Sequence, residues 1–186
     1  MRKLIWVFLL IFAVAVPTIG QSTQTLNPQT LVDEWFRRLN DLDNWFISVD
    51  GKEQTDEVVD RMMELYAPDA LQFVGPAEDQ LGPVMLVGRE PIRKWFENFA
   101  RTYVQVAYRI DVQTAGKEQT AALLYTTRLP WGGVGVSCQI TGVYSLRENR
   151  RKFMSPGGLF VQFREDGKIQ RLRFLIQKDE TVEIFK

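Results

Sequence analysis

The chain has 186 residues, with 23 basic and 23 acidic side chains and no histidine. This balance of charge does not favour binding to nucleic acid or to an anionic membrane surface. The absence of histidine excludes Ser-His-Asp and Cys-His catalysis and histidine-ligated metals, and the single Cys138 excludes an internal disulfide.

The N-terminus has the pattern of a signal peptide. Arg2 and Lys3 precede the apolar run Leu4–Val16, and Thr18-Ile19-Gly20 supplies small residues near a cleavage site. The run is shorter than the roughly 20 residues of a membrane span, although an uncleaved anchor is the alternative. We expect residues 1–20 to be removed on export to the periplasm or outside the cell. Residues 21–186 would then form one domain with no membrane contact.

Helical patterns occupy the first half of this domain. Asn27-Pro28 is typical of a helix start, and apolar residues recur at helical spacing as far as Phe46. A second helix is predicted from Thr55 through Tyr66, ending at Pro68, and a third from Glu90-Pro91. The strand Leu71–Val74 and its hairpin partner Val84–Val87 are predicted between the second and third helices.

From Tyr103 onward the apolar period changes to two, which indicates strands. Further strands are predicted at Thr120–Leu129, Val134–Arg147, Leu159–Glu165 and Lys168–Lys178, and Asp166-Gly167 is predicted as the last hairpin turn. Pro130–Met154 is long for a hairpin, so it predicts either an additional strand or an extended hairpin arm. The predicted fold is α+β, with three N-terminal helices packed on a strongly bent antiparallel sheet.

The segment from Leu65 to Phe99, LYAPDALQFVGP followed by VGREPIRKWFENF, resembles the SnoaL-like branch of the nuclear transport factor 2-like superfamily. The resemblance extends from Leu31 to Gln177. It implies a cone-like half-barrel around a pocket, and a homodimer formed through the outer face of the sheet.

The catalytic residues of two related enzyme groups are not carried over. When the segment is aligned with the ketosteroid isomerases, Val74 occupies the position of the catalytic aspartate. When the later segments YTTRLPW and KIQRLRF are aligned with the limonene epoxide hydrolases, Arg128 keeps the arginine, but Pro130 and Phe174 replace the two aspartates. Arg109-Ile110-Asp111 has the Arg-x-Asp spacing, yet alternation predicts that both charged side chains lie on the outer face.

No cofactor or metal is expected, because the dense acidic groups lie on the polar sides of amphipathic helices. The basic residues Arg147, Arg150, Arg151 and Lys152 are interpreted as a solvated hairpin tip, with an anionic surface partner as the alternative.

The favoured hypothesis is binding of a small apolar or aromatic molecule in a central pocket. The proposed ligand-binding residues are Phe73, Trp95, Phe99, Tyr108, Tyr125, Tyr144 and Phe174, with Cys138 also facing inward. Trp131 either caps the pocket mouth or covers a sheet edge.

Two alternatives remain open. One is a histidine-independent lyase, isomerase or hydrolase that uses tyrosine hydroxyls and Arg128. The other is a non-catalytic dimerisation module whose interface includes Arg109, Asp111, Arg171 and Arg173. A pocket of roughly 300 Å³ or more would favour a ligand, and a filled one would favour the module.

Overall fold

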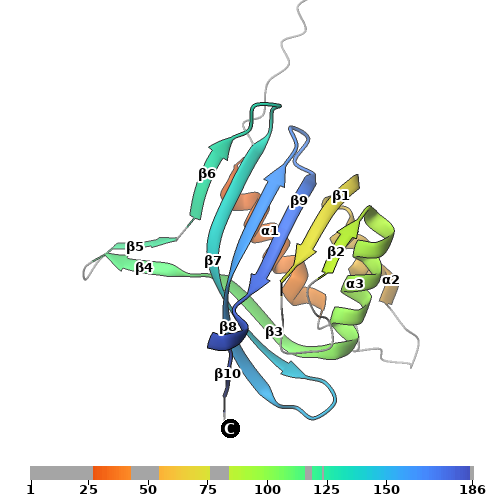
Figure 1. The fold of residues 1–186 in the computed structure, drawn as a ribbon, viewed down its shortest axis with the longest axis vertical. Coiled ribbons are helices and arrows are strands. Elements are labelled where there is room, and N and C mark those ends of the chain that lie inside the picture. The colour runs from red at the N-terminus through yellow and green to blue at the C-terminus, as the bar shows by residue number, and fades with distance from the viewer. Residues whose placement is uncertain (1–26, 43–54, 76–83, 116–118, 123, 185–186) are drawn as a thin grey trace, which may run out of the picture.

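The computed structural model describes residues 27–42, 55–75, 84–115, 119–122 and 124–184. The predicted signal peptide, Phe46 and the loop between Pro76 and Pro83 lie outside these residues. Three helices, α1 (Pro28–Asp41), α2 (Thr55–Met63) and α3 (Arg89–Thr102), lie on one side of an 8-stranded sheet (Figure 1). No helix in these ranges is long and apolar enough to cross a membrane.

Two of the helices begin where their sequences predict. The Asn27 Oδ1 atom accepts hydrogen bonds from the N–H groups of Gln29 at 3.1 Å and Thr30 at 3.4 Å, which caps α1. Gly88 precedes α3 with a φ of 82°, a value that an L side chain rarely adopts. The apolar faces of these helices turn toward the sheet and bury Trp35, Leu39, Trp95 and Phe99 among others.

The sheet runs in the order β2, β1, β9, β8, β7 and β3, with β6 also paired to β7 and β10 to β8. The bounds are β1 Tyr66–Val74, β2 Val84–Val87, β3 Tyr103–Ile110, β6 Leu124–Arg128, β7 Val134–Leu146, β8 Lys152–Phe163, β9 Ile169–Ile176 and β10 Val182–Glu183. A separate ribbon of β4 (Val112–Ala115) and β5 (Gln119–Ala122) extends away from the body (Figure 1). A short 3₁₀ helix, η2 (Lys178–Glu180), precedes β10.

The α+β prediction is confirmed, but a purely antiparallel sheet is wrong. Strand β1 pairs with β9 in parallel, with Leu71 opposite Arg171 and Val74 opposite Phe174, so the sheet is mixed and it does not close. The second helix was also predicted too long. It ends at Met63, and Tyr66 begins β1 instead, where its buried hydroxyl accepts a hydrogen bond from Trp35 Nε1 at 3.0 Å.

The long segment from Pro130 to Met154 forms part of an extended hairpin. Strands β7 and β8 remain paired from Val134 opposite Phe163 to Ser145 opposite Lys152. The other edge of β7 is shared by two strands, because β6 pairs with its first part and β3 with its second. The end of the hairpin is tied down, because Arg151 makes two hydrogen bonds to the Glu183 carboxylate of β10, at 2.9 and 2.6 Å.

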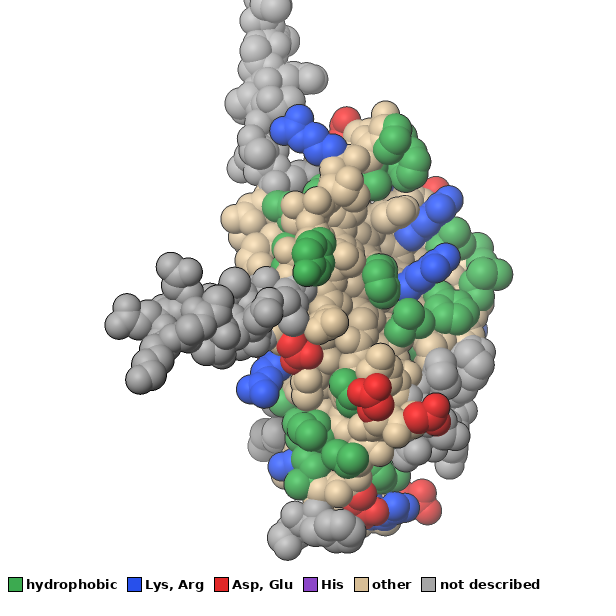
Figure 2. Space-filling model, turned by 60° about the vertical axis from the view of Figure 1, so that its left-hand side comes forward, with side chains coloured by type: hydrophobic (Ala, Val, Ile, Leu, Met, Phe, Trp, Pro, Cys, Tyr) green, Lys and Arg blue, Asp and Glu red, His purple; other side chains and the backbone are tan. Residues whose placement is uncertain are grey.

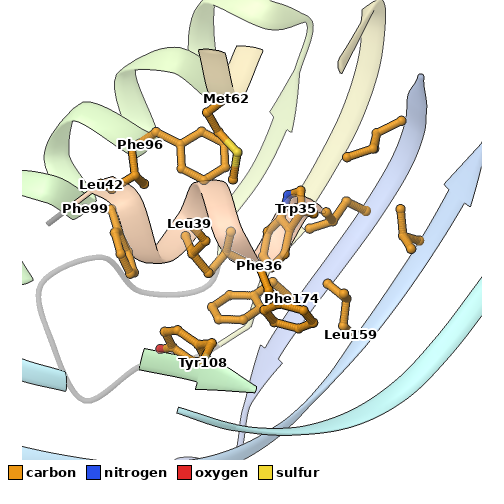
Figure 3. Close-up of a cluster of buried hydrophobic side chains, with 14 of the residues drawn as sticks. Trp35, Phe36, Leu39, Leu42, Met62, Phe96, Phe99, Tyr108, Leu159 and Phe174 are labelled. Carbon is orange, nitrogen blue, oxygen red and sulfur yellow. The ribbon is translucent and has the colours of Figure 1, made fainter. Parts of the chain in front are cut away.

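The core fills the space between α1, α3 and the sheet. Figure 3 shows Trp35, Phe36 and Leu39 of α1 directed toward Phe174 and Leu159 of the sheet. The rings of Trp35 and Phe174 lie 5.8 Å apart. Burial of these large side chains is the dominant source of stability for a domain of this size.

Candidate functional site

A small aromatic cavity lies between α3 and the inner face of the sheet. Its volume is about 10 Å³. That is room for about one water molecule. The lining residues are Val74, Trp95, Phe99, Tyr103, Tyr108, Tyr144, Phe174 and Ile176. By volume, the cavity is close to filled.

The rings around this cavity form a continuous chain of contacts. The centroids of Trp95 and Phe99 are 5.2 Å apart, those of Phe99 and Tyr103 are 4.7 Å apart, and those of Tyr103 and Tyr144 are 5.0 Å apart. Tyr108 meets Phe174 edge to face at 5.1 Å. Such offset and edge-to-face pairs are favourable geometries, and they make the wall continuous and largely apolar. Figure 3 shows Phe99, Tyr108 and Phe174 converging from three different elements.

Two polar atoms at this wall behave differently. The Tyr144 hydroxyl is 3.0 Å from Ser155 Oγ, and Thr181 Oγ1 lies 2.9 Å from the same Ser155 atom. In contrast, the buried indole Nε1 of Trp95 has no hydrogen-bond partner in the described part of the chain. A buried donor without an acceptor costs about 1–3 kcal/mol. Trp95, one of the residues that line the cavity, therefore carries an unused N–H group.

The position of Tyr108 depends on two neighbours. Asn40 of α1 makes two hydrogen bonds to the backbone of Tyr108. Asn40 Oδ1 accepts from the Tyr108 N–H at 2.9 Å, and Asn40 Nδ2 donates to the Tyr108 carbonyl at 3.2 Å. Gly142 lies opposite Tyr108 on β7, and a Cβ atom there would come within 2.1 Å of the Tyr108 ring. Glycine is therefore needed for the ring to lie flat against the sheet.

A second buried polar chain lies beside the cavity. Trp35 Nε1 donates to the Tyr66 hydroxyl, which donates to Gln72 Oε1 at 2.7 Å. Burial raises the pKa of the Tyr66 hydroxyl well above its usual range, so it stays protonated. Gln72 Nε2 has no partner among the described residues. Among the described residues, the interior thus contains the unused donors of Trp95 and Gln72, and no aspartate or glutamate is buried there as a general base.

The structure brings five of the seven proposed ligand-binding residues together. Trp95, Phe99, Tyr108, Tyr144 and Phe174 all line the cavity. The inward direction predicted for the other two is wrong. Phe73 is 37% exposed and Tyr125 is 69% exposed, and both lie on the opposite face of the sheet.

The strand register explains both errors. In β1 both Gln72 and Val74 are buried, so Phe73 between them points outward. In β6 Leu124 pairs with Cys138 and Tyr125 pairs with Ser137. Paired residues share a face of the sheet, so a buried Cys138 places Tyr125 on the other face.

Other residues singled out from the sequence lie away from the cavity. Arg128 is exposed on β6, and Trp131, which is exposed in the turn after β6, is not among the lining residues. Arg109 is exposed on β3, as expected. Cys138 is buried, and burial raises the pKa of its thiol to about 12, so it is protonated and unreactive at neutral pH.

The basic hairpin tip is only partly solvated. Arg147 is half-buried, and its Nη2 donates to the carbonyls of Ala100 at 3.2 Å and Tyr103 at 3.1 Å, at the end of α3. Arg151 pairs with Glu183. No group of three or more possible metal ligands occurs in the residues that the structure describes.

Sequence patterns missed Tyr103 and Asn40. Gln105 has a φ of 56° and forms an irregularity between Val104 and Ala107, which shifts the alternation and turns Tyr103 inward. The bonds between Asn40 and Tyr108 join two elements that are far apart in sequence. The sequence signal for these bonds was weak: Asn40 is a polar residue beside the apolar face of its helix.

The comparisons with known proteins agree with this architecture. The SnoaL-like domain model matches residues 53–172, which is more than half of the chain. The chain belongs to the SnoaL-like domain family. No curated protein sequence matches it.

Several solved structures share the fold. The epoxide hydrolase/cyclase-like enzyme SalBIII, involved in pyran ring formation in the polyether salinomycin, has 16% identity and a TM-score of 0.56, over 84% of this chain and 95% of that one. Rv0760c from Mycobacterium tuberculosis, in complex with estradiol-17β-hemisuccinate, has 9% identity and a TM-score of 0.55, over 83% and 96%. A computationally designed 17-OHP binder has 10% identity and a TM-score of 0.53, over 84% and 97%. At such identities the likeness concerns the fold alone.

Proposed function

We propose that this SnoaL-like domain binds a small, flat apolar or aromatic molecule that carries a hydrogen-bond acceptor. The unpartnered Trp95 Nε1 within an aromatic wall is the observation that carries the proposal. An acceptor on the ligand would satisfy that N–H, and the rings of Phe99, Tyr108 and Phe174 would cover the apolar part. Two neighbours of similar fold, the estradiol-hemisuccinate complex and the 17-OHP binder, are described with ligands of this general kind.

The small cavity sets a condition on binding. Because about 10 Å³ admits only about one water molecule, the ligand must displace that water and push some of the rings apart. Satisfying the Trp95 N–H would offset part of this cost.

The experiment compares two ligands with the same ring system, naphthalene and 2-acetylnaphthalene, which adds a carbonyl acceptor, by thermal shift and calorimetric titration. Trp95→Phe removes the donor and keeps a large ring. We expect it to weaken 2-acetylnaphthalene about tenfold, the value of one buried hydrogen bond, and to leave naphthalene within about twofold. Trp131→Phe, at a side chain that is 66% exposed, is the matched control and should change neither.

The proposal would be contradicted if Trp95→Phe lost affinity equally for both ligands, or if the wild type bound neither. Native mass spectrometry of protein from its own host is a complementary measurement, because a retained ligand appears as added mass.

Catalysis is not part of this proposal. The described residues that line the cavity include no aspartate, glutamate or histidine, so they do not supply the usual general base. We expect little turnover of ketosteroid or epoxide substrates. The enzyme alternative loses Arg128 as an electrophile at this cavity, because that side chain lies on the exposed strand β6.

A non-catalytic homodimerisation module is the second candidate, and the nearly filled cavity favours it. Its contact surface would be the outer face of the sheet, where Arg109, Arg171 and Arg173 are exposed. Ile169 lies two residues before Arg171, so strict alternation predicts it on that face, but it is fully buried because an irregularity at the start of β9 turns it inward. Light scattering at tens of micromolar distinguishes a dimer from a monomer.

Export is proposed from the N-terminal pattern of the sequence. N-terminal sequencing of the exported protein should begin near Gln21. Recovery of intact Met1 in a membrane fraction would contradict it.

A further inference from the structure

The outer face of the sheet carries an ordered row of side chains that the inner cavity does not involve. Strand pairing places one residue from each of six neighbouring strands in line across this face. From β2 to β6 the row reads Met85, Phe73, Arg173, Phe160, Ser137 and Tyr125. The next row, two residues along, reads Val87, Leu71, Arg171, Gln162, Gly135 and Thr127. Two arginines therefore lie among apolar and aromatic side chains.

Part of this face is hollowed into a groove of about 490 Å³. Gly135 and Ser137 have small side chains or none, while Tyr125 and Phe160 on the flanking strands are 69% and 48% exposed and form the walls. This volume is in the range of sites that hold small organic molecules. The inner cavity, at about 10 Å³, is not.

The two arginines of the groove have no acidic partner among the described residues. No carboxylate in the described ranges lies within ion-pair distance of Arg171 or Arg173, in contrast to Arg37, Arg93 and Arg151. Both are exposed and sit two residues apart on β9, so both point to the same side. Guanidinium groups in this arrangement suit a carboxylate, to which arginine donates in a bidentate manner.

We propose that this outer groove binds a small amphipathic anion, with a flat apolar body over Gly135 and Ser137 and an anionic group at Arg171 and Arg173. Charge complementarity selects this occupant. A second copy seated on a two-fold axis at the groove would offer these arginines the same two rows of side chains, and those rows contain no aspartate or glutamate to pair with them. Figure 2 shows hydrophobic side chains standing beside Lys and Arg side chains on one face of the molecule.

The test is calorimetric titration with 2-naphthoate, a planar arene with one carboxylate, and with 2-naphthalenemethanol as its neutral counterpart. The wild type should bind the acid saturably and the alcohol at least about tenfold more weakly, because only the acid forms charge-assisted hydrogen bonds. The double variant Arg171→Gln/Arg173→Gln should lose about tenfold in affinity for the acid and keep its affinity for the alcohol. Arg109→Gln, another exposed arginine on a sheet strand, is the matched control and should bind as the wild type does.

This result is separable from the function proposed for the inner cavity. Trp95→Phe should leave naphthoate binding unchanged, and the arginine variants should leave binding of 2-acetylnaphthalene unchanged. A negative result for the inner cavity therefore does not count against the outer groove, and the reverse also holds.

Three outcomes would overturn the inference. They are absence of saturable naphthoate binding, equal affinity for acid and alcohol, and a wild-type dimer in sedimentation whose dissociation is required before naphthoate binds. In the last case a second copy would be the occupant of the groove. Thermal melts that coincide for wild type and double variant establish that a lost affinity does not reflect unfolding.

Discussion

Asn40 joins helix α1 directly to the cavity wall. Its amide side chain satisfies both backbone groups of Tyr108. These groups belong to β3, which is paired with β7 and presents its other edge to α1. An amide can serve there because it carries a donor and an acceptor together.

We expect Asn40→Ala to lower the free energy of unfolding by about 1–3 kcal/mol, because it leaves a buried N–H and a carbonyl without partners. Chemical denaturation checks this. Asn98→Ala, at an exposed position of α3, is the control and should change stability by less than about 0.5 kcal/mol. An equally small effect at Asn40 would show that water replaces its two bonds.

At the scale of elements, the sequence predicts helix starts well and strand faces less well. The cap at Asn27 is local, and local chemistry decides it. The faces of Phe73, Tyr125 and Ile169 depend instead on irregularities and on pairing with distant strands. Hydrophobicity favoured burial of Phe73, whereas the structure buries Gln72, whose carbonyl accepts from Tyr66.

The same distinction applies to the candidate site. Trp95 and Phe99 were predictable because they lie on the apolar face of α3 at helical spacing. Tyr103 was not, since its inward direction depends on the positive φ of Gln105, a conformation that a glutamine in a strand does not predict. The outer groove was not predictable either, because it requires knowledge of which strands are neighbours.

Helix α1 carries a charge cluster that makes the fold sensitive to acid. Two hydrogen bonds from Arg37, with a further one from Arg38, lower the pKa of Glu34 from 4.5 to about 2. A carboxylate with a lowered pKa in the folded state stabilises the protein above its unfolded pKa, and this contribution disappears as the pH falls from 4.5 toward 2.

Glu34→Gln should therefore lower the melting temperature at pH 6 and converge with the wild type near pH 2. Solvent screening of the partly exposed pair limits the difference to about 1 kcal/mol or less. Thermal melts across this range check it, with Glu90→Gln, an exposed carboxylate of α3, for comparison. Parallel curves for wild type and Glu34→Gln would contradict the assignment to Glu34.

At the scale of the whole molecule, β9 joins the two parts of the sheet. It lies between β1 and β8, and it supplies Phe174 and Ile176 to the cavity. A chain that ends at Glu165 should therefore lose cooperative unfolding in calorimetry, because β1 and β8 lose their common neighbour. A chain that ends at Ile184 keeps every described element and should melt as the full chain does. A cooperative transition in the shorter chain would show that the helices and β1 hold together without β9.

We expect the parallel pairing of β1 with β9 to form late in folding. Residues near position 71 must wait for those near position 171, and the entropy of closing so long a loop is paid before their contact contributes. During synthesis β1 and β2 therefore emerge with an unpaired edge that only the C-terminal part can cover. We expect refolding on the slow, millisecond-to-second side of the range for single domains. The interval before β9 arrives is when this chain is most exposed to aggregation.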